Sequence, residues 1–436
     1  MRVLVLVDGE HHPSAVRTAL SELRRDGDEI VGAVFCGGTE KVDLERLDEA
    51  YAIPVVRGEE LPRILGDAIT EWKAELVIDL TDHPVITATD RFRLASVALD
   101  RGVPYRGADF DLRPPEFERV LTKPSIRVFA TGKRTGKTAV ASALARRAAV
   151  RGRRPVIVAV GRGGPHPPRV IEAGTKLDAR TLVELADAGH HAGSDYVEDA
   201  ITSGVTTIGC VRVGGGLAGG TVYSNVPDAA RLAEERDEDL VILEGSGASI
   251  PDVDADSGLI CVPAHVATAE LEDYLGPYRL LLADAAVVTM AEEASAAAAT
   301  EAAIHGTVPD LDVVCVTFRP EPMESVNGRR VFFCCTAPAE ARPVLVQHLE
   351  QKHGCEVVGF TNRLSDRAVL PRELEAAPPY DVLVTEIKAA GIDVAARHAL
   401  GAGKDVVFAN NVLVGDGIEE VFDLVIDRAI DAGVER

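Results

Sequence analysis

Residues 126–150 have the sequence IRVFATGKRTGKTAVASALARRAAV, which carries the clearest structural signal in the chain. Its pattern predicts an apolar strand, a glycine-containing turn and an alanine-rich helix, in that order. The turn closes on Gly136, Lys137 and Thr138, the last three residues of a Walker A motif. In such a loop the backbone N–H groups converge on phosphate oxygens, and the helix N-terminus adds its partial positive charge. The stretch therefore predicts a unit that binds the phosphates of a nucleotide.

The loop is a variant of the strict pattern G-x-x-x-x-G-K-[ST], which requires glycine at position 131. This chain has Thr131 there and Gly132 one residue later. The variant is similar to the loops of the P-loop class that includes dethiobiotin synthetase and MinD-like ATPases. We expect Lys137 to reach the β- and γ-phosphates and the Thr138 hydroxyl to ligate Mg²⁺. The predicted nucleotide-binding residues of the loop are Thr131, Gly132, Lys133, Arg134, Thr135, Gly136, Lys137 and Thr138.

Glu244 is the second candidate ligand for Mg²⁺. It ends the apolar run LVILE (240–244) and is followed by the glycine-rich GSG (245–247). In P-loop proteins a carboxylate at the end of a later strand holds Mg²⁺, directly or through water. A surface glutamate at a strand end is the alternative interpretation. The sequence thus predicts Thr138 and Glu244 as the metal ligands.

Two short segments bear on the base of the nucleotide. TKLD (175–178) matches the guanine signature [NT]-K-x-D by letters, but it precedes the strand that ends in Glu244. That order is wrong for a GTPase, so we interpret the match as chance. TNRL (361–364) follows the apolar run EVVGFT, and its Asn362 is the candidate for reading adenine. The predicted cofactors are therefore ATP and Mg²⁺.

Short β-branched runs alternate with helical stretches along the whole chain, and several runs are apolar throughout. Strands buried on both faces have this pattern, which predicts α/β folding with mainly parallel sheets and helices on both faces. Three prolines, Pro114, Pro115 and Pro124, interrupt the alternation just before the phosphate loop. We therefore expect a small N-terminal α/β domain over 1–118. A P-loop NTPase domain of the dethiobiotin synthetase/MinD-like class follows over 119–436.

The composition narrows the class of protein. The 436 residues include 46 basic and 69 acidic side chains, a net charge of −23. Nucleic-acid binding and attachment to anionic membranes both need a surplus of Lys and Arg, so neither is expected. No apolar run approaches the ~20 residues of a membrane span. The seven cysteines are odd in number and form no CxxC pair, which favours a reducing cytosol. We expect a soluble, cytoplasmic protein.

Three basic, glycine-rich loops follow strands of the larger domain. They are VGRGGPHPP (160–168), VRVGGGLAGGTVYSNV (211–226) and TEIKAAGIDVAAR (385–397). Ligands of open α/β sheets bind at the carboxyl ends of strands, and glycine-rich backbone lets N–H groups approach an anion closely. A solvated surface charge is the alternative for each cation taken singly. Together they predict a polyanionic small substrate bound by Arg162, Arg212, Gly214, Gly215, Gly216 and Lys388.

Three histidine-containing segments are less specific. GHHAGSDYVEDA (189–200) has adjacent histidines, His190 and His191, but no partner at a helical offset for an HExxH-type site. Helix capping by Ser194 is the favoured interpretation, and a substrate or Mg²⁺ role for the segment, which also holds Asp195 and Tyr196, is the alternative. In the N-terminal domain, DGEHHP (8–13) and TDHPVITATDRFRLA (81–95) follow strands where a doubly wound domain would bind a ligand.

Eight segments spread over nearly the whole chain belong together. They are VDGEHHP (7–13), DRFRLASVALDRGVPYRGADF (90–110), ATGKRTGKT (130–138), VGRGGP (160–165), HHAGSDYVEDA (190–200), VGGGLAGGTVYSNV (213–226), LEGSGASIP (243–251) and VTEIKAAGIDVAAR (384–397). Taken together, these segments resemble the cyclic 2,3-diphosphoglycerate synthetase family. The resemblance implies ATP- and Mg²⁺-dependent closure of 2,3-diphosphoglycerate into an intramolecular phosphoanhydride, with release of ADP and phosphate. It also implies a homodimer.

The candidate residues fit that chemistry. The two phosphates of one substrate repel each other, so ring closure needs cations around them and a leaving group on one of them. ATP can supply the leaving group by phosphorylating one phosphate, after which the other attacks. Lysines of the loop, together with Mg²⁺, would neutralise the transferring phosphoryl group. The candidate catalytic residues are Lys137, Lys133, Arg212 and Lys388.

Two functions of other classes remain open. A P-loop ligase that activates a carboxylate with ATP, as dethiobiotin synthetase does, would need similar cations, so only trial of substrates separates it. A nucleotide-dependent switch or metallochaperone would need a guanine motif in the right order or a His/Cys metal pair. The chain has neither of these features.

Overall fold

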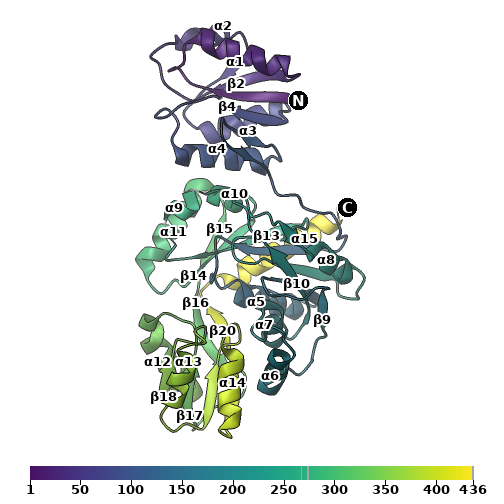
Figure 1. Cartoon of the computed structure of the whole chain (residues 1–436), viewed down its shortest axis with the longest axis vertical. Helices are drawn as coiled ribbons and strands as arrows, with labels where there is room; N and C mark the ends of the chain where they lie inside the picture. The colour runs from purple at the N-terminus through teal and green to yellow at the C-terminus, as the bar shows by residue number, and fades with distance from the viewer. Residues whose placement is uncertain (267, 273, 435–436) are drawn as a thin grey trace.

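The computed structural model describes residues 1–266, 268–272 and 274–434, and within them the strands form three sheets (Figure 1). Most neighbouring strands are parallel, and helices lie on the faces of the sheets. The predicted fold class, α/β with mainly parallel sheets and an N-terminal domain ahead of a P-loop domain, is confirmed. Within the described residues, no helix is both long and apolar enough to cross a membrane.

The N-terminal sheet has the strand order β3-β2-β1-β4-β5-β6. Residues 3–7 of strand β1 are all apolar and buried, because both faces of the strand are covered: its valines pack with α1 and α2, and Leu4 and Leu6 pack with α3 and α4. All pairs are parallel except β5 with β6. The elements are β1 (Arg2–Val7), α1 (Pro13–Arg25), β2 (Glu29–Phe35), α2 (Leu47–Tyr51), β3 (Val55–Val56), α3 (Leu61–Glu71), β4 (Leu76–Asp79), α4 (Ala88–Asp100), β5 (Tyr105–Arg106) and β6 (Asp111–Leu112).

The central sheet follows the order β11-β10-β8-β12-β7-β13-β14-β15, with β9 antiparallel to β10. Its middle strands are wholly buried, as their continuous apolar runs predict. The elements are β7 (Ser125–Ala130), α5 (Lys137–Val150), β8 (Pro155–Gly161), β9 (Arg169–Ile171), α6 (Ala179–Asp187), α7 (Asp195–Ser203), β10 (Thr206–Val213), β11 (Tyr223–Ser224), α8 (Val226–Glu234), β12 (Leu240–Glu244), β13 (Ser257–Pro263), α9 (Thr268–Glu272), α10 (Gly276–Leu281), β14 (Ala285–Thr289), α11 (Ala294–Thr307) and β15 (Asp312–Cys315).

The third sheet has the order β16-β20-β19-β17-β18, with only β16 antiparallel to its neighbour among the strands described. The last helix, α15, leaves this sheet and packs on the central one, where Arg147 binds Asp423 (Figure 1). The elements are β16 (Thr317–Pro322), β17 (Arg330–Cys334), α12 (Arg342–His353), β18 (Glu356–Thr361), α13 (Leu370–Glu375), β19 (Val382–Thr385), α14 (Ile392–Gly401), β20 (Asp405–Val414) and α15 (Ile418–Val434).

The strands after residue 124 thus divide between two sheets, which the sequence pattern does not separate. The apolar run 312–318 suggests one strand, yet it contributes to β15 and to β16, which lie in different sheets. Between them, the N–H of Val316 donates to Val288 O at 2.8 Å. A division at residue 118 falls in the connector between β6 and β7, and as a domain boundary it stays a prediction.

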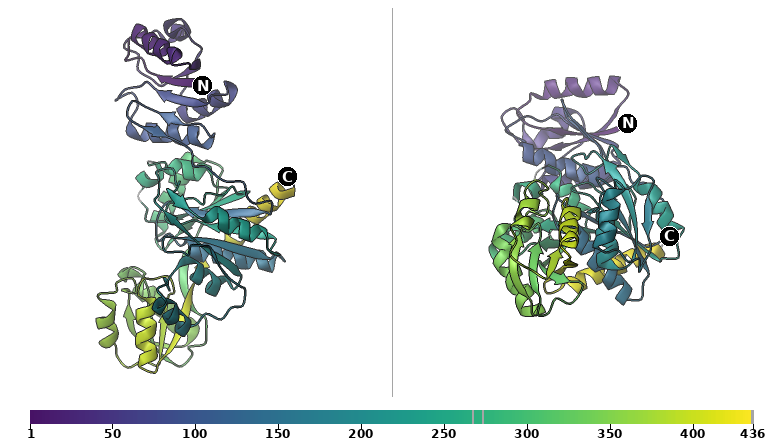
Figure 2. Two further views of the ribbon diagram at one scale, coloured as in Figure 1. Left: turned by 45° about the vertical axis from the view of Figure 1, so that its right-hand side comes forward. Right: turned by 60° about the horizontal axis from the view of Figure 1, so that its bottom comes forward.

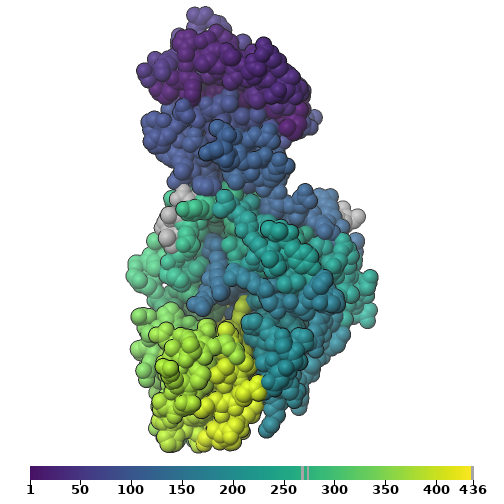
Figure 3. Space-filling model, viewed as in Figure 1, coloured from purple at the N-terminus to yellow at the C-terminus, as the bar shows by residue number. Residues whose placement is uncertain are grey.

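The N-terminal domain stands at one end of an elongated molecule (Figures 2 and 3). Its helix α4 packs on α10 of the central domain. The rings of Phe92 and Tyr274 lie 5.7 Å apart, and Arg93 forms an ion pair with Glu272 at 3.2 Å. Loops that follow central strands meet loops that follow C-terminal strands, as the hydrogen bond from Lys388 to Thr138 shows, and the candidate site is built there.

Candidate functional site

The phosphate loop connects the buried strand β7 to helix α5, as the sequence predicts. Gly136 occupies the position before α5 with φ of +80°, a conformation that side chains rarely adopt. A Cβ atom at this position would lie 2.3 Å from the ring of Phe318, which comes from β16. The close approach of Phe318 therefore requires glycine at position 136. This contact joins the third sheet to the loop.

Lys137 is the buried cation of the loop, with 6% of its surface exposed. Its ammonium donates to the carbonyl oxygens of Gly132 and Gly247, each at 3.0 Å. Burial, reinforced by the nearby Lys388, lowers the pKa of Lys137 to about 8. A phosphate would add negative charge next to this ammonium and offset the cost of its burial, so the loop is built to bind an anion.

Thr138, Glu244 and Lys388 meet beside the loop, although 250 residues separate the first from the last. The Thr138 hydroxyl donates to Glu244 Oε1 at 2.6 Å, and Lys388 Nζ donates to Thr138 Oγ1 at 2.5 Å. Lys388 also pairs with Asp195 and lies 4.0 Å from Glu244. Burial alone lowers the pKa of Lys388, but these carboxylates raise it well above its usual value. Lys388 is therefore a fixed cation among hard oxygen ligands.

Two buried acids behind this group, Glu198 and Asp199, were not predicted. Burial raises the pKa of Glu198 to about 8, and burial together with Glu244 raises that of Asp199 well above its usual value. Ser142 donates to Asp199 Oδ1 at 2.9 Å. In the described structure Glu198 Oε2, Asp199 Oδ2 and Glu244 Oε2 are buried without a hydrogen-bond partner. The only sequence signal was the acidic pair at the centre of VEDA (197–200), which is not specific.

These residues could hold Mg²⁺. The hydroxyl of Thr138 and the carboxylates of Asp195 and Glu244 are oxygen donors, which Mg²⁺ prefers. Glu244 Oε2 is buried without a hydrogen-bond partner among the described residues, and a divalent cation beside it would offset the charge of that carboxylate. The donor set therefore fits the metal.

Arg162 and Arg212 converge on the loop after β12. Arg212 donates to Gly214 O and Ser246 O, both at 2.7 Å. A Cβ atom at Gly247 would lie 2.4 Å from an Arg162 nitrogen and 3.1 Å from an Arg212 nitrogen. Because Gly247 O also accepts from Lys137, both guanidinium groups lie near the phosphate loop. Burial and the charge of Arg162 lower the pKa of Arg212, so a second anion would be stabilising here. The loop containing Gly214, Gly215 and Gly216 is exposed beside Arg212.

Asn362 and Arg134 line one cavity between the phosphate loop and the C-terminal sheet, with a volume of about 650 Å³. In Figure 3 the surface is hollowed where these two parts meet. Thr336, Arg363 and Arg367 also line the cavity. Lys133 is exposed on the loop, whereas Thr131 Oγ1 is buried and has no partner among the described residues. The candidate adenine residue is thus adjacent to the loop.

The favoured interpretation of Ser194 is only half right. Ser194 occupies the N-cap position of α7, but its hydroxyl makes no capping hydrogen bond. The first residue of the helix, Asp195, instead pairs with Lys388. The physical reason is the burial of Ser194 at this point, which leaves the next side chain to face the site. His191 lies against Gly163, which belongs to the loop 160–168 that also contains Arg162.

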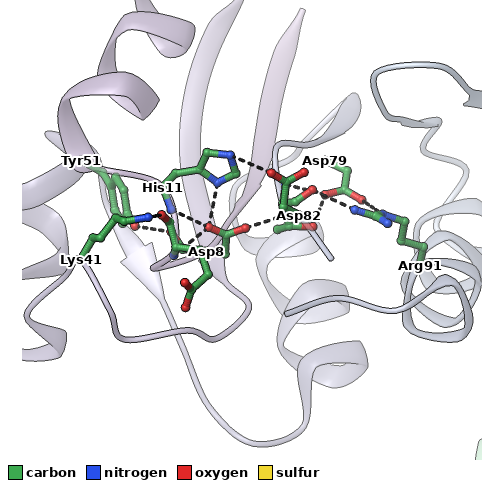
Figure 4. A network of polar contacts seen from close by, with 9 residues as sticks. Asp8, His11, Lys41, Tyr51, Asp79, Asp82 and Arg91 are labelled. Carbon is green, nitrogen blue, oxygen red and sulfur yellow. Dashed lines mark hydrogen bonds and ion pairs between the residues drawn. The ribbon is translucent and has the colours of Figure 1, made fainter. Parts of the chain in front are cut away.

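In the N-terminal domain, the segments that follow β1 and β4, residues 8–13 and 81–95, are joined by a network of polar contacts (Figure 4). The carboxylate of Asp8 accepts from the N–H groups of Glu10, His11 and Asp82 and from His11 Nδ1, at 2.8–3.1 Å. Asp79, at the end of β4, binds Arg91 at 2.8 Å. Burial alone raises the pKa of Asp8, but the hydrogen bonds from Asp82 and His11 outweigh it, and the pKa lies below its usual value. Asp8 thus ties two loops together.

Replacing Asp8 by asparagine is expected to destabilise the N-terminal domain by about 1–3 kcal/mol, because a buried amide cannot accept all these bonds. The stabilisation from ionised Asp8 is complete above the unfolded carboxyl pKa of about 3.9 and is lost as pH falls through the lower folded value. The single tryptophan, Trp72, lies against Gly32 of this domain, so its fluorescence reports unfolding there. Asp67→Asn, at an exposed position, is the control. If the two variants have the same free energy of unfolding from pH 3 to 7, Asp8 does not hold the two loops together.

A parallel sheet that presents a buried loop lysine and a threonine–glutamate pair at its edge defines a P-loop nucleotide-binding protein. Three domain models of cyclic 2,3-diphosphoglycerate synthetase match consecutive parts of the chain. The N-terminal domain matches residues 2–113, the P-loop domain 125–317 and the C-terminal domain 322–412. The chain belongs to the cyclic 2,3-diphosphoglycerate synthetase family, and the resemblance seen in the sequence is confirmed.

Curated relatives with that name are similar over almost their full length. The chain is 43% identical to that of Rubrobacter xylanophilus, with 96% of each chain covered. It is 41% identical to that of Methanothermus fervidus, with 98% of each covered, and 40% identical to that of Thermococcus sibiricus, with 99% of each covered. Among solved structures, LpxK from Aquifex aeolicus in complex with ATP is 14% identical. It superposes with a TM-score of 0.41 over 72% of this chain and 90% of that one, and this low similarity does not bear on function.

Proposed function

We propose that this enzyme closes 2,3-diphosphoglycerate into cyclic 2,3-diphosphoglycerate, consuming ATP with Mg²⁺ and releasing ADP and phosphate. The observation that carries the proposal is the convergence of two groups of cations at one sheet edge. Lys137 and Lys388 lie at the phosphate loop, and Arg162 and Arg212 gather at Gly247, whose carbonyl accepts from Lys137. The relatives that carry the synthetase name support the substrate.

The phosphate loop binds the triphosphate of ATP in this proposal. Lys137 reaches the β- and γ-phosphates, and the exposed Lys133 closes over them from the loop. Mg²⁺ on Thr138 and Glu244 supplies charge neutralisation between these phosphates when it is bound. Asp195, beside them, is a further oxygen donor that the sequence left open. The adenine enters the cavity of Arg134 and Asn362, where the Asn362 amide can both donate and accept.

The substrate is held on the other side of Lys137. Arg162, Arg212 and the backbone of Gly214–Gly216 bind its two phosphates, and Lys388 lies between them and the γ-phosphate. In the first step a phosphate oxygen of the substrate forms a bond to the γ-phosphorus, and the bond to ADP breaks. In the second step the other phosphate attacks the phosphorylated one and expels inorganic phosphate. Fixed cations stabilise the charge that develops in both steps.

We also propose that the enzyme is a cytoplasmic homodimer. The dimer rests on the family resemblance. All seven cysteines are free thiols, and six of them are buried, as suits a reducing compartment.

Arg212→Ala is expected to weaken binding of 2,3-diphosphoglycerate by about 10-fold or more, because a charge-assisted hydrogen bond contributes roughly 1.5–3 kcal/mol. Binding of ATP should change much less, since Arg212 comes from β10 and Lys137 from the phosphate loop. Calorimetric titration of each ligand separately measures the difference. Arg180→Ala, at an exposed helical position, is the matched control. Equal loss of ATP and substrate affinity in Arg212→Ala would move this arginine into the nucleotide site.

A further inference from the structure

A trio of potential metal ligands lies in the C-terminal domain, outside the phosphate site. Glu321 is on β16, and His348 and His353 are on α12, the helix beside it (Figure 1). One ligand atom from each of the three side chains lies within 4.8 Å of the other two. His353 Nε2 is 3.6 Å from Glu321 Oε1, and the two imidazole rings are 5.6 Å apart.

The two histidines have a second property that points to a ligand. The Nε2 atoms of His348 and His353 are both buried, and neither has a hydrogen-bond partner within the described residues. Only 15% of the His353 side chain is exposed. Buried polar atoms are normally paired, so two such nitrogens in one cluster with a carboxylate require an explanation. A shared metal ion would pair both of them.

The surrounding charges leave the trio able to bind a cation. Lys352 holds Glu321 through Oε2 at 2.7 Å, so Oε1 stays on the side of His353. The other nearby cation, Arg319, is paired with Glu292.

We infer that Glu321, His348 and His353 form a binding site for a divalent transition-metal ion, with Zn²⁺ as its representative. Two imidazole nitrogens and one carboxylate oxygen form a donor set of Zn²⁺, with a fourth position left for water. Mg²⁺ prefers oxygen ligands alone, so this site and the proposed Mg²⁺ site select different ions. The ion would clamp α12 to β16, the strand whose Phe318 covers Gly136 of the phosphate loop.

The test uses the full chain without an affinity tag, freed of metal by a chelator and kept in excess Mg²⁺. Zn²⁺ is titrated against a chromogenic chelator. We expect one equivalent to bind, and His348→Ala or His353→Ala to weaken that binding by about 10- to 100-fold or more, at least the loss seen for outer partners of metal ligands. His398→Ala, on α14, is the matched control and should bind normally. Lys352→Ala, which removes the competing cation, should bind at least as tightly as the unaltered chain.

Unchanged Zn²⁺ affinity in both histidine variants would overturn the inference, as would equal loss in His398→Ala. Should the alanine variants unfold, the visible spectrum of the unaltered chain with Co²⁺ decides. Absorption bands of Co²⁺ with nitrogen and oxygen ligands that saturate at one equivalent of Co²⁺ would support the site. Thiolate charge-transfer bands, or no saturable bands, would contradict it.

Discussion

Lys137→Ala is expected to lower turnover by about 10²–10³, since the loss of one transition-state donor typically costs roughly 3–4 kcal/mol. The ammonium is buried and lies 3.0 Å from the carbonyl oxygens of Gly132 and Gly247, whereas Lys133 on the same loop is exposed, so the variant loses the buried charge of the loop. The effect should fall on the chemical step and on ATP binding together. Steady-state rates with ATP and 2,3-diphosphoglycerate, with thermal unfolding as a check on folding, measure the change.

The pKa of Lys137 adds a second signature. Since burial holds it at about 8 in the free enzyme, ATP affinity should fall as pH rises through that value and the ammonium loses its proton. Lys137→Ala should lack this particular pH dependence. Lys176→Ala is the control, because that exposed lysine belongs to the chance guanine match. Near-normal turnover in Lys137→Ala would remove the phosphate loop from the mechanism.

Glu244→Gln is expected to raise the Mg²⁺ concentration needed for half-maximal rate by at least about 10-fold, the loss seen even for outer partners of metal ligands. The carboxylate is fully buried and accepts from Thr138 at 2.6 Å. A neutral amide keeps the size of the side chain but is a poorer ligand for a hard cation. The maximal rate should fall as well, because Lys388 loses one of its carboxylate neighbours.

Measurement of the rate against Mg²⁺ concentration at saturating ATP separates the change in Mg²⁺ requirement from the change in maximal rate. Glu184→Gln, at an exposed position on α6, should titrate like the unaltered enzyme. A Glu244→Gln enzyme with an unchanged Mg²⁺ titration would assign Glu244 to structure alone.

The sequence predicts the α/β class and the strand–loop–helix unit because both depend on local patterns. Strand β7 is buried throughout and mostly apolar, and Gly136 to Thr138 follow at a fixed distance. The rule that ligands gather at strand ends predicts that Lys388 faces the nucleotide, and in the structure its ammonium lies beside Thr138. The division of the run 312–318 between β15 and β16 is not predictable in this way. Strands β15 and β16 are both mostly half-buried and both carry apolar side chains, so the periodicity does not change where the chain crosses from one sheet to the other.

The buried acids Glu198 and Asp199 could not be predicted from the sequence for a different reason. Glu198 and Asp199 lie in a helix whose sequence resembles any amphipathic segment, and their importance depends on burial against Glu244 and Lys388. Those partners come from strands and loops far away in the chain. Likewise, Glu321 and the two histidines of α12 are brought together only by the packing of that helix on β16. Contacts of this kind need the tertiary structure.

The proposed reaction is tested most directly by phosphorus NMR of the enzyme with ATP, Mg²⁺ and 2,3-diphosphoglycerate. If the cations at Lys137 and at Arg162 and Arg212 act on one substrate, both monoester resonances should be replaced by a coupled anhydride pair. ADP and phosphate should then accumulate one for one with the cyclic product, and Lys137→Ala should form all three about 10²–10³ more slowly. Consumption of ATP with unchanged monoester signals would contradict cyclisation and favour a ligase that activates a carboxylate.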